Sequence, residues 1–130
     1  MEELYEEIIK KLKNLHLKGE ESIYASKQDT KGISPLKRSW FLAISNLTGV
    51  EFFPQTLQGK FYLVYKGDEN LVNLLGQLEI KVEKVIKQKI KEISEERGIK
   101  DRQTSVLIKT QLYNELTSKL MLSDFKRFKK

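Results

Sequence analysis

The stretch SPLKRSWFLAISNLTG, residues 34–49, is the most clearly bounded element of the chain. Ser34 can cap a helix, and Pro35 suits the first helical position because its φ is already helical and its missing N–H would be unbonded there. Apolar residues then recur at helical spacing, and Gly49 can adopt the left-handed conformation that ends a helix. The sequence therefore predicts a helix over residues 35–48.

Helical periodicity also extends to both sides of this element. Apolar residues recur at steps of three and four, and predict further helices over residues 2–17, 68–97 and 101–120. At about 45 Å the second of these outruns the core of so small a domain, so we expect it to bend or to pack partly on another chain. Ser123 and Asp124 could begin a short basic tail helix.

One segment has a different character. Residues 59–68 are rich in aromatic and β-branched side chains between two glycines, which predicts a strand. It pairs either with part of residues 20–33, which otherwise look like a mobile loop, or with residues 50–53, or it is a buried extended segment. We therefore expect a mainly α fold, a single-domain helical bundle over residues 1–130 with one short strand or β-hairpin and a basic C-terminal tail over 123–130.

Composition excludes several classes of protein. Of the 130 residues, 39% are hydrophobic and 32% are charged, which predicts a folded chain with a polar surface. The chain has no cysteine, so it can hold no disulfide and no Cys-ligated metal. No apolar run approaches the roughly 20 residues that span a bilayer, and the acidic start is unlike a signal peptide. We expect a cytoplasmic protein with no membrane partner.

Positive charge is concentrated in two segments. The formal charge is +6, and residues 36–66 carry four basic and one acidic side chain, while residues 101–130 carry seven and three. Aromatic side chains are interleaved with these bases, which favours a polyanion that also offers stacking faces, such as DNA or RNA in single-stranded or primer–template form. The alternative is an ordinary lysine-rich surface with the aromatic rings in the core.

Residues that could catalyse a reaction are scarce. The only histidine, His16, lies near the end of the first predicted helix without the neighbours of a triad or a metal site. Neither a Walker-type loop nor a glycine-rich dinucleotide turn is present. We therefore expect no enzyme activity, no metal and no cofactor.

The start of the 35–48 helix is the sharpest candidate site. Its free N–H groups, together with Ser34, Lys37 and Arg38, could hold a phosphate. The alternative is that these charges are simply exposed, and that the nearby Trp40 belongs to the core. Further nucleic-acid contacts are predicted from the other basic and aromatic clusters, with bases at Lys60, Lys66, Lys126 and Arg127 and stacking rings at Trp40, Tyr62 and Tyr65.

The same helix, from Pro35 to Gly49, resembles a helix in the iron–sulfur domain of the archaeal and eukaryotic primase large subunit. Arg38 falls at the position of a nucleotide-contacting arginine of that family. The resemblance covers about 15 residues, and the four cysteines that bind the family's cluster are absent. It implies a cysteine-free accessory relative that helps primer initiation together with other protein subunits.

Two functions are thus predicted from the sequence. The first is a non-catalytic nucleic-acid- or nucleotide-binding accessory subunit of a replication machine. The rival is a helical protein–protein adaptor that uses the 68–97 helix as its interface. The first function predicts that the other helices cover the stripe formed by Val82, Ile86, Ile90 and Ile93, whereas the adaptor predicts that they cover it only in part and leave an apolar patch.

Overall fold

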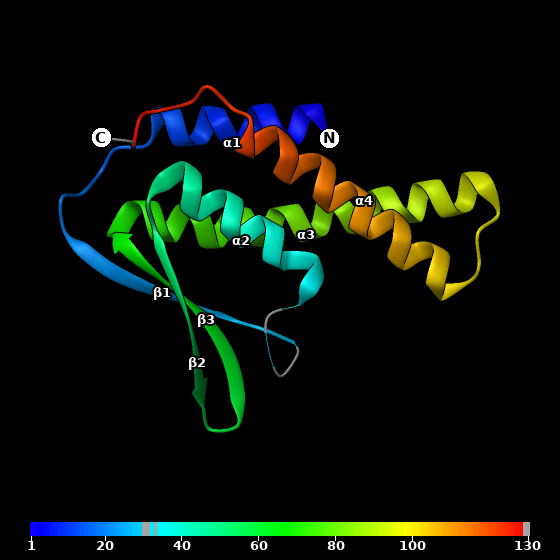
Figure 1. Cartoon of the computed structure of the whole chain (residues 1–130), viewed down its shortest axis with the longest axis horizontal. Coiled ribbons are helices and arrows are strands. Elements are labelled where there is room, and N and C mark those ends of the chain that lie inside the picture. Colours follow the sequence, from blue (N-terminus) through cyan, green and yellow to red (C-terminus); the bar gives the residue numbers. More distant parts are fainter. Residues whose placement is uncertain (30–31, 33, 129–130) are drawn as a thin grey trace.

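The computed structural model describes residues 1–29, 32 and 34–128 (Figure 1). Four helices and three strands follow one another as α1 (Glu2–Asn14), β1 (Glu21–Lys27), α2 (Pro35–Thr48), β2 (Glu51–Leu57), β3 (Lys60–Asp68), α3 (Glu69–Arg97) and α4 (Arg102–Met121). Within the described residues, no helix is both long and apolar enough to cross a membrane.

The mainly α prediction is confirmed, but the chain is not a simple helical bundle. It contains a three-stranded antiparallel sheet of order β1-β3-β2, with the helices packed on one face of it (Figure 1). The predicted strand, β3, lies at the centre and pairs with both segments that were considered as its partner. The prediction of a mobile loop is wrong for residues 21–27, which form β1, while residues 30, 31 and 33 of that loop lie outside the described part.

Local signals set the helix ends as expected. The Ser34 hydroxyl caps α2 by accepting from the Leu36 N–H at 3.3 Å, and Gly49 ends the helix at a φ of 74°. Asp68 caps α3, and Gly98 ends it at a φ of 64°. The first helix stops at Asn14 rather than at residue 17.

A tight turn joins β2 to β3. Gln58 and Gly59 both have positive φ, 52° and 74°, which is the backbone of a two-residue hairpin whose twist matches the strands. The sequence predicted pairing with residues 50–53 only as one of three possibilities for the 59–68 segment. Pro54 is tolerated because it lies on an edge strand.

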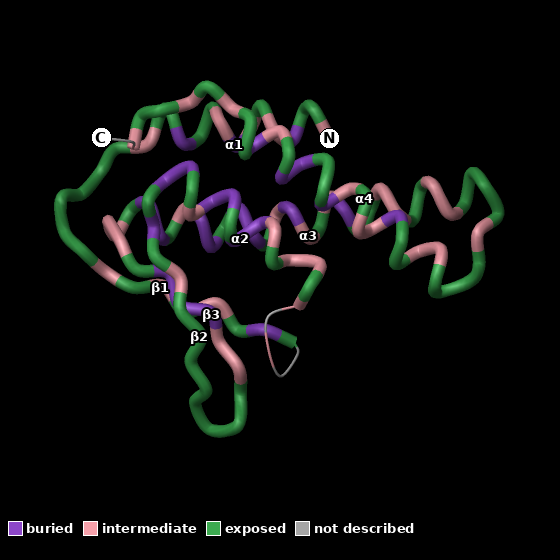
Figure 2. Tube along the Cα trace, viewed as in Figure 1, coloured by how far each residue is buried: buried purple, intermediate pink, exposed green. Residues whose placement is uncertain are grey.

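The core lies between the helices and the inner face of the sheet (Figure 2). Trp40, Ile44 and Tyr65 are almost completely buried there, with 1%, 0% and 0% exposure. Val82 and Ile86 of α3 are buried as well, and the core around them includes residues of α1 and α4, so this half of the stripe is covered as the first function predicted.

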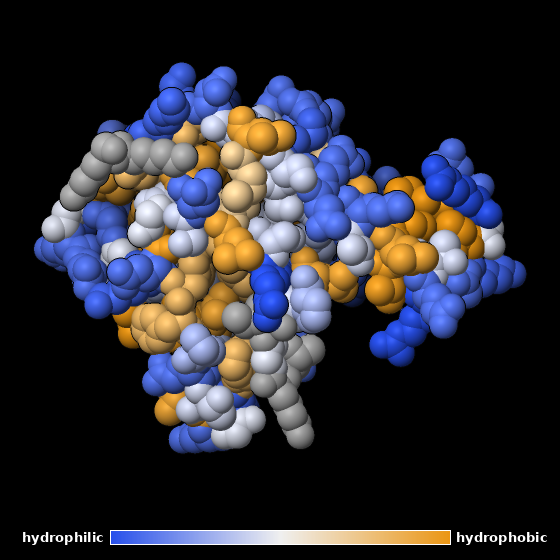
Figure 3. Space-filling view, in the orientation of Figure 1, coloured by the Kyte–Doolittle hydropathy of each residue, from blue (hydrophilic) through white to orange (hydrophobic). Residues whose placement is uncertain are grey.

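The second half of α3 extends beyond the core, as the length of the helix led us to expect. Ile90 and Ile93 are only partly buried. Residues 88–110, which we call the α3–α4 arm, extend away from the sheet and carry an apolar surface (Figures 1 and 3). Val106 and Leu107 are 43% and 63% exposed on this arm.

The described part of the C-terminal tail, residues 123–128, is not helical. After α4 it runs back along α1, and Phe125 and Phe128 pack against the core with ring centroids 5.9 Å apart. Arg127 donates to the backbone oxygens of Leu12, at 2.6 Å, and Lys13, at 3.0 Å. The tail therefore closes the carboxyl end of α1, where the last carbonyls of a helix lack internal partners.

Candidate nucleic-acid interface

The strand pairing sorts the sheet residues onto two faces. Directly paired residues share a face, and along a strand every second residue returns to it. The rings of Tyr24, Tyr65 and Phe52 meet on the inner face, with Phe52 and Tyr65 4.6 Å apart, under the helices. Residues of the opposite parity form the outer face, with Glu21, Ile23, Ala25 and Lys27 on β1, Lys60, Tyr62, Val64, Lys66 and Asp68 on β3, and Glu51, Phe53, Gln55 and Leu57 on β2.

Helices leave the outer face open. Ile23 is 59% exposed, Phe53 38% and Leu57 54%, although all three are apolar. Val64 is buried at the centre of this face yet is not part of the core cluster under the helices. Its direct cross-strand neighbours are Ala25 on β1 and Phe53 on β2, so the face runs across all three strands.

Tyr62 is the centre of the candidate site. It is partly exposed and lies directly opposite Lys27 on β1 and Gln55 on β2. Lys60 follows on the same face of β3, two residues along the strand and about 7 Å away. One aromatic ring is thus surrounded by two cations and an amide, which can contact a base, a phosphate and a base edge.

Lys66, at the other end of the outer face, has acidic neighbours within the protein. Its Nζ lies 3.6 Å from a carboxylate oxygen of Glu21, and Glu51 is its direct cross-strand partner. The excess positive charge of the outer face is therefore at the Tyr62 end, near Lys27 and Lys60.

The predicted phosphate site at the start of α2 has a different environment. The Lys37 side chain is only 13% exposed and forms ion pairs with Glu79, at 3.8 Å, and with Glu83, both on α3. Its charge is thus neutralised within the protein. Arg38 is exposed, and its side chain forms no ion pair or hydrogen bond with any described residue. Of the three predicted phosphate contacts here, Ser34 caps the helix, Lys37 is internal and Arg38 alone faces solvent.

Glu79 is the hub of this internal polar cluster. It is 5% exposed and accepts hydrogen bonds from the hydroxyls of Tyr65 and, at 2.9 Å, Ser26. Burial, reinforced by the Glu79 charge, raises the pKa of the Tyr65 hydroxyl far above its ordinary value. The cluster ties β1, β3 and α2 to α3, and its groups satisfy one another.

Two of the three predicted stacking rings are not available to a base. Trp40 and Tyr65 are buried in the core, because each fills the space between the sheet and the helices. This corrects the prediction of a stacking role for both and leaves Tyr62 as the predicted ring at the surface. In the tail, Lys126 is exposed, whereas Arg127 is bound to the end of α1.

The predicted site residues therefore fall in three separate places. Lys60, Tyr62 and Lys66 share the outer face, Ser34, Lys37 and Arg38 begin α2, and Lys126 and Arg127 lie beside α1. Sequence reasoning missed Lys27, Phe53 and Gln55 of the outer face. The alternation of polar and apolar residues in 21–27 is a signal that could have identified the first of these.

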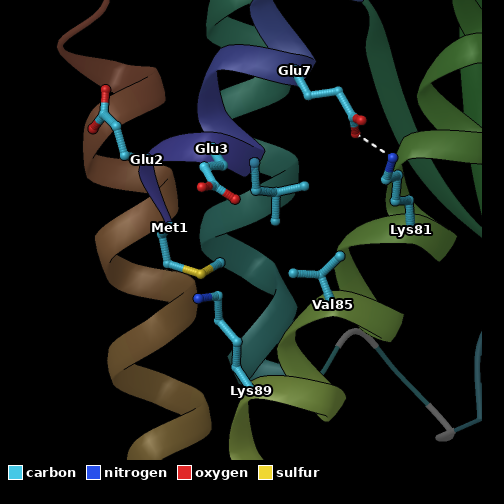
Figure 4. Close-up of a pocket in the computed structure, with 8 residues that line it drawn as sticks. Met1, Glu2, Glu3, Glu7, Lys81, Val85 and Lys89 are labelled. Atoms are coloured by element: carbon cyan, nitrogen blue, oxygen red, sulfur yellow. Dashed lines mark ion pairs between the residues drawn. The ribbon is translucent and has the colours of Figure 1, made fainter.

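Cavities also lie elsewhere. One of about 390 Å³ opens between α2 and β2, with Arg38 at an otherwise mainly apolar lining that includes Phe41 and Phe52. Another, of about 450 Å³, lies between α1 and α3 (Figure 4). Its acidic lining residues come from α1 and its lysines from α3, and the Glu7–Lys81 ion pair at 2.5 Å holds the pKa of Glu7 below its usual value. Within the described residues, no three His, Cys, Asp or Glu side chains are placed to share a metal ion.

No protein-family model, curated protein or solved structure matches this chain.

Proposed function

We propose that this protein binds single-stranded nucleic acid on the outer face of its sheet, as a non-catalytic accessory subunit of a nucleic-acid-handling complex. The observation that carries this proposal is the position of Tyr62 on the central strand of an uncovered face, between Lys27, Gln55 and Lys60. The ring would stack on a base, the two ammonium groups would bind the flanking phosphates, and the amide would contact a base edge.

A single strand suits this surface better than a duplex. A base can stack on Tyr62 only when it has left its own stack, and bases within a duplex do not offer a free face. Phe53, diagonal to Tyr62 on the same face, provides a second exposed ring. The face from Lys60 to Lys66 is roughly 20 Å long at 3.4 Å per residue, which gives room for more than one nucleotide.

The most specific form of this proposal is a primase-associated role, in which the protein helps position a template or an initiating nucleotide. It is supported by the likeness of residues 35–49 to a primase helix and by the exposure of Arg38, which has no partner among the described side chains. In this form Arg38 would provide a second anion contact, separate from the outer face.

Binding of labelled oligonucleotides by fluorescence anisotropy at 50 mM salt tests the proposal. Tyr62→Ala should weaken binding of a single-stranded oligonucleotide by roughly tenfold to a hundredfold, because stacking on one ring contributes about 1–3 kcal/mol. Tyr62→Phe keeps the ring and should bind like the wild type. Single strands should bind more tightly than the matching duplex.

A matched pair of lysine variants distinguishes binding at the outer face from attraction by the net positive charge of the molecule. Lys60→Ala should weaken binding and reduce the salt slope, while Lys91→Ala, an exposed lysine on α3, should change binding little. Equal effects of the two variants, or no binding by the wild type at low salt, would contradict the proposal.

The adaptor function remains the second candidate because of one observation, the exposure of Val106 and Leu107 on the α3–α4 arm. An adaptor would bind no oligonucleotide at low salt, and Tyr62→Ala would then have no effect. The same anisotropy measurement therefore distinguishes the two functions.

A further inference from the structure

The two edges of the sheet are protected differently. In β2 the residues that close the Gln58–Gly59 turn form a hydrogen-bonded pair with β3, so the backbone groups of Phe52, Pro54 and Thr56 point away from the sheet. Pro54 removes the outward N–H from the middle of this edge, which is a common protection against strand addition.

The β1 edge has no such protection. The Gln28 N–H donates to the Phe61 oxygen at 2.8 Å, so the even-numbered residues of β1 bond to β3. The backbone groups of the odd-numbered residues consequently point outward. These residues are Glu21, Ile23, Ala25 and Lys27, and within the described chain no strand pairs with them.

The sequence of β1, Glu-Ser-Ile-Tyr-Ala-Ser-Lys, is complementary to its own reverse. When two copies are placed antiparallel with Tyr24 opposite Tyr24, Glu21 lies opposite Lys27 at both ends. Ile23 then lies opposite Ala25, and Ser22 opposite Ser26. This register also places the outward-pointing odd residues opposite one another, as a hydrogen-bonded ladder requires.

From this complementarity we infer that the occupant of the β1 edge is a second copy of the chain, joined through an antiparallel β1–β1 pair on a two-fold axis at Tyr24. The two sheets become one six-stranded sheet. Pairing satisfies the free backbone groups of β1, and it covers Ile23, which is 59% exposed in the single chain. Opposite charges at both ends favour this register over its neighbours. The inference does not depend on the proposed function.

Sedimentation velocity across roughly 5 to 500 µM protein, without nucleic acid, tests the pairing. The wild type should form a dimer, with a dissociation constant of roughly tens of micromolar because one strand pair buries a small area. Ala25→Pro removes an outward N–H and should weaken the dimer at least tenfold. Thr56→Pro removes an outward N–H from the other edge and should leave the dimer unchanged. Circular dichroism confirms that both variants fold.

The register is tested by charge exchange and by cross-linking. Glu21→Lys alone should weaken the dimer, and adding Lys27→Glu should restore it. Because the chain has no cysteine, Ser22→Cys and Ser26→Cys can report the register directly. A mixture of the two variants should form an oxidised cross-linked dimer, and neither variant alone should do so.

Three results would overturn the inference. A wild type that stays monomeric at the highest concentration has no such pair. Equal effects of Ala25→Pro and Thr56→Pro would assign the dimer to another surface. Cross-linking by either cysteine variant alone, or none by the mixture, would show that the strands pair in another register or not at all.

Discussion

Basic side chains at the start of α2 and on the outer face of the sheet look alike in the sequence, but the fold uses them differently. Lys37 lies between two carboxylates of α3, whereas Lys60 is exposed beside Tyr62. Arg127 and Lys126 repeat this contrast at the C-terminus, where the first closes α1 and the second faces solvent. A basic cluster therefore indicates a binding surface only after the charges that the protein itself neutralises have been set aside.

The largest expected effect on stability concerns Glu79, the buried counter-ion of Lys37. Glu79→Ala should lower the free energy of unfolding by about 3–5 kcal/mol, because it leaves Lys37 without a buried counter-ion and the Tyr65 hydroxyl without its acceptor. Urea denaturation followed by circular dichroism measures this change. Glu83→Ala is the matched control, because Glu83 also pairs with Lys37 but is 39% exposed, and it should cost less than about 1 kcal/mol. Similar values for the two variants would show that burial does not set the strength of these pairs.

The next prediction compares the two neighbouring bases of the tail. Arg127→Ala should lower stability by about 1–2 kcal/mol, because the last carbonyls of α1 lose a charged donor. Lys126→Ala should stay within about 0.5 kcal/mol of the wild type, since its side chain is exposed and forms no ion pair with any described residue. Thermal melts of both variants provide the measurement. An unchanged melting temperature for Arg127→Ala would show that the contacts of Arg127 with α1 do not stabilise the protein.

Asp68 is an acidic side chain whose charge is likewise used within the protein, because its carboxylate accepts hydrogen bonds from backbone N–H groups. Partial burial acts to raise its pKa, but N–H groups of Gly19, Lys18 and the first turn of α3 outweigh this and hold the pKa below its usual value. A lowered folded-state pKa stabilises the protein above the pKa of the unfolded carboxyl, and this stabilisation is lost as the pH falls through the folded value. Asp68→Asn should therefore cost about 1 kcal/mol at pH 7, and the difference from the wild type should shrink below about pH 4. A difference that is constant from pH 7 to pH 3 would contradict the role of the charge.

How far the sequence predicts this fold depends on whether a signal is local. Ser34, Pro35 and Gly49 act on their own backbone, so the ends of α2 were predicted correctly. The β2 strand was obscured by Pro54, which breaks a central strand but is harmless where its missing N–H would face outward. The Lys37–Glu79 pair joins residues 42 positions apart, and no local pattern marks it. Strand periodicity is a local signal, so the sequence can place Lys60, Tyr62 and Lys66 on one face. Whether that face is exposed depends on where the helices pack, which no local pattern shows.

The smallest expected effect on stability concerns the exposed lysines of the outer face, and this prediction tests the proposed interface. Lys27→Ala combined with Lys60→Ala should leave stability within about 0.5 kcal/mol of the wild type, because both side chains are exposed. The double variant should lower the slope of log Kd against log salt for a single-stranded oligonucleotide by about 1–2, since two phosphate contacts are lost. Lys126→Ala is the control, because its charge lies outside the proposed site beside α1. That variant should leave the slope unchanged. If it reduced the slope as much as each lysine of the outer face does, the oligonucleotide would be bound by the net charge of the molecule, which would contradict a specific site around Tyr62.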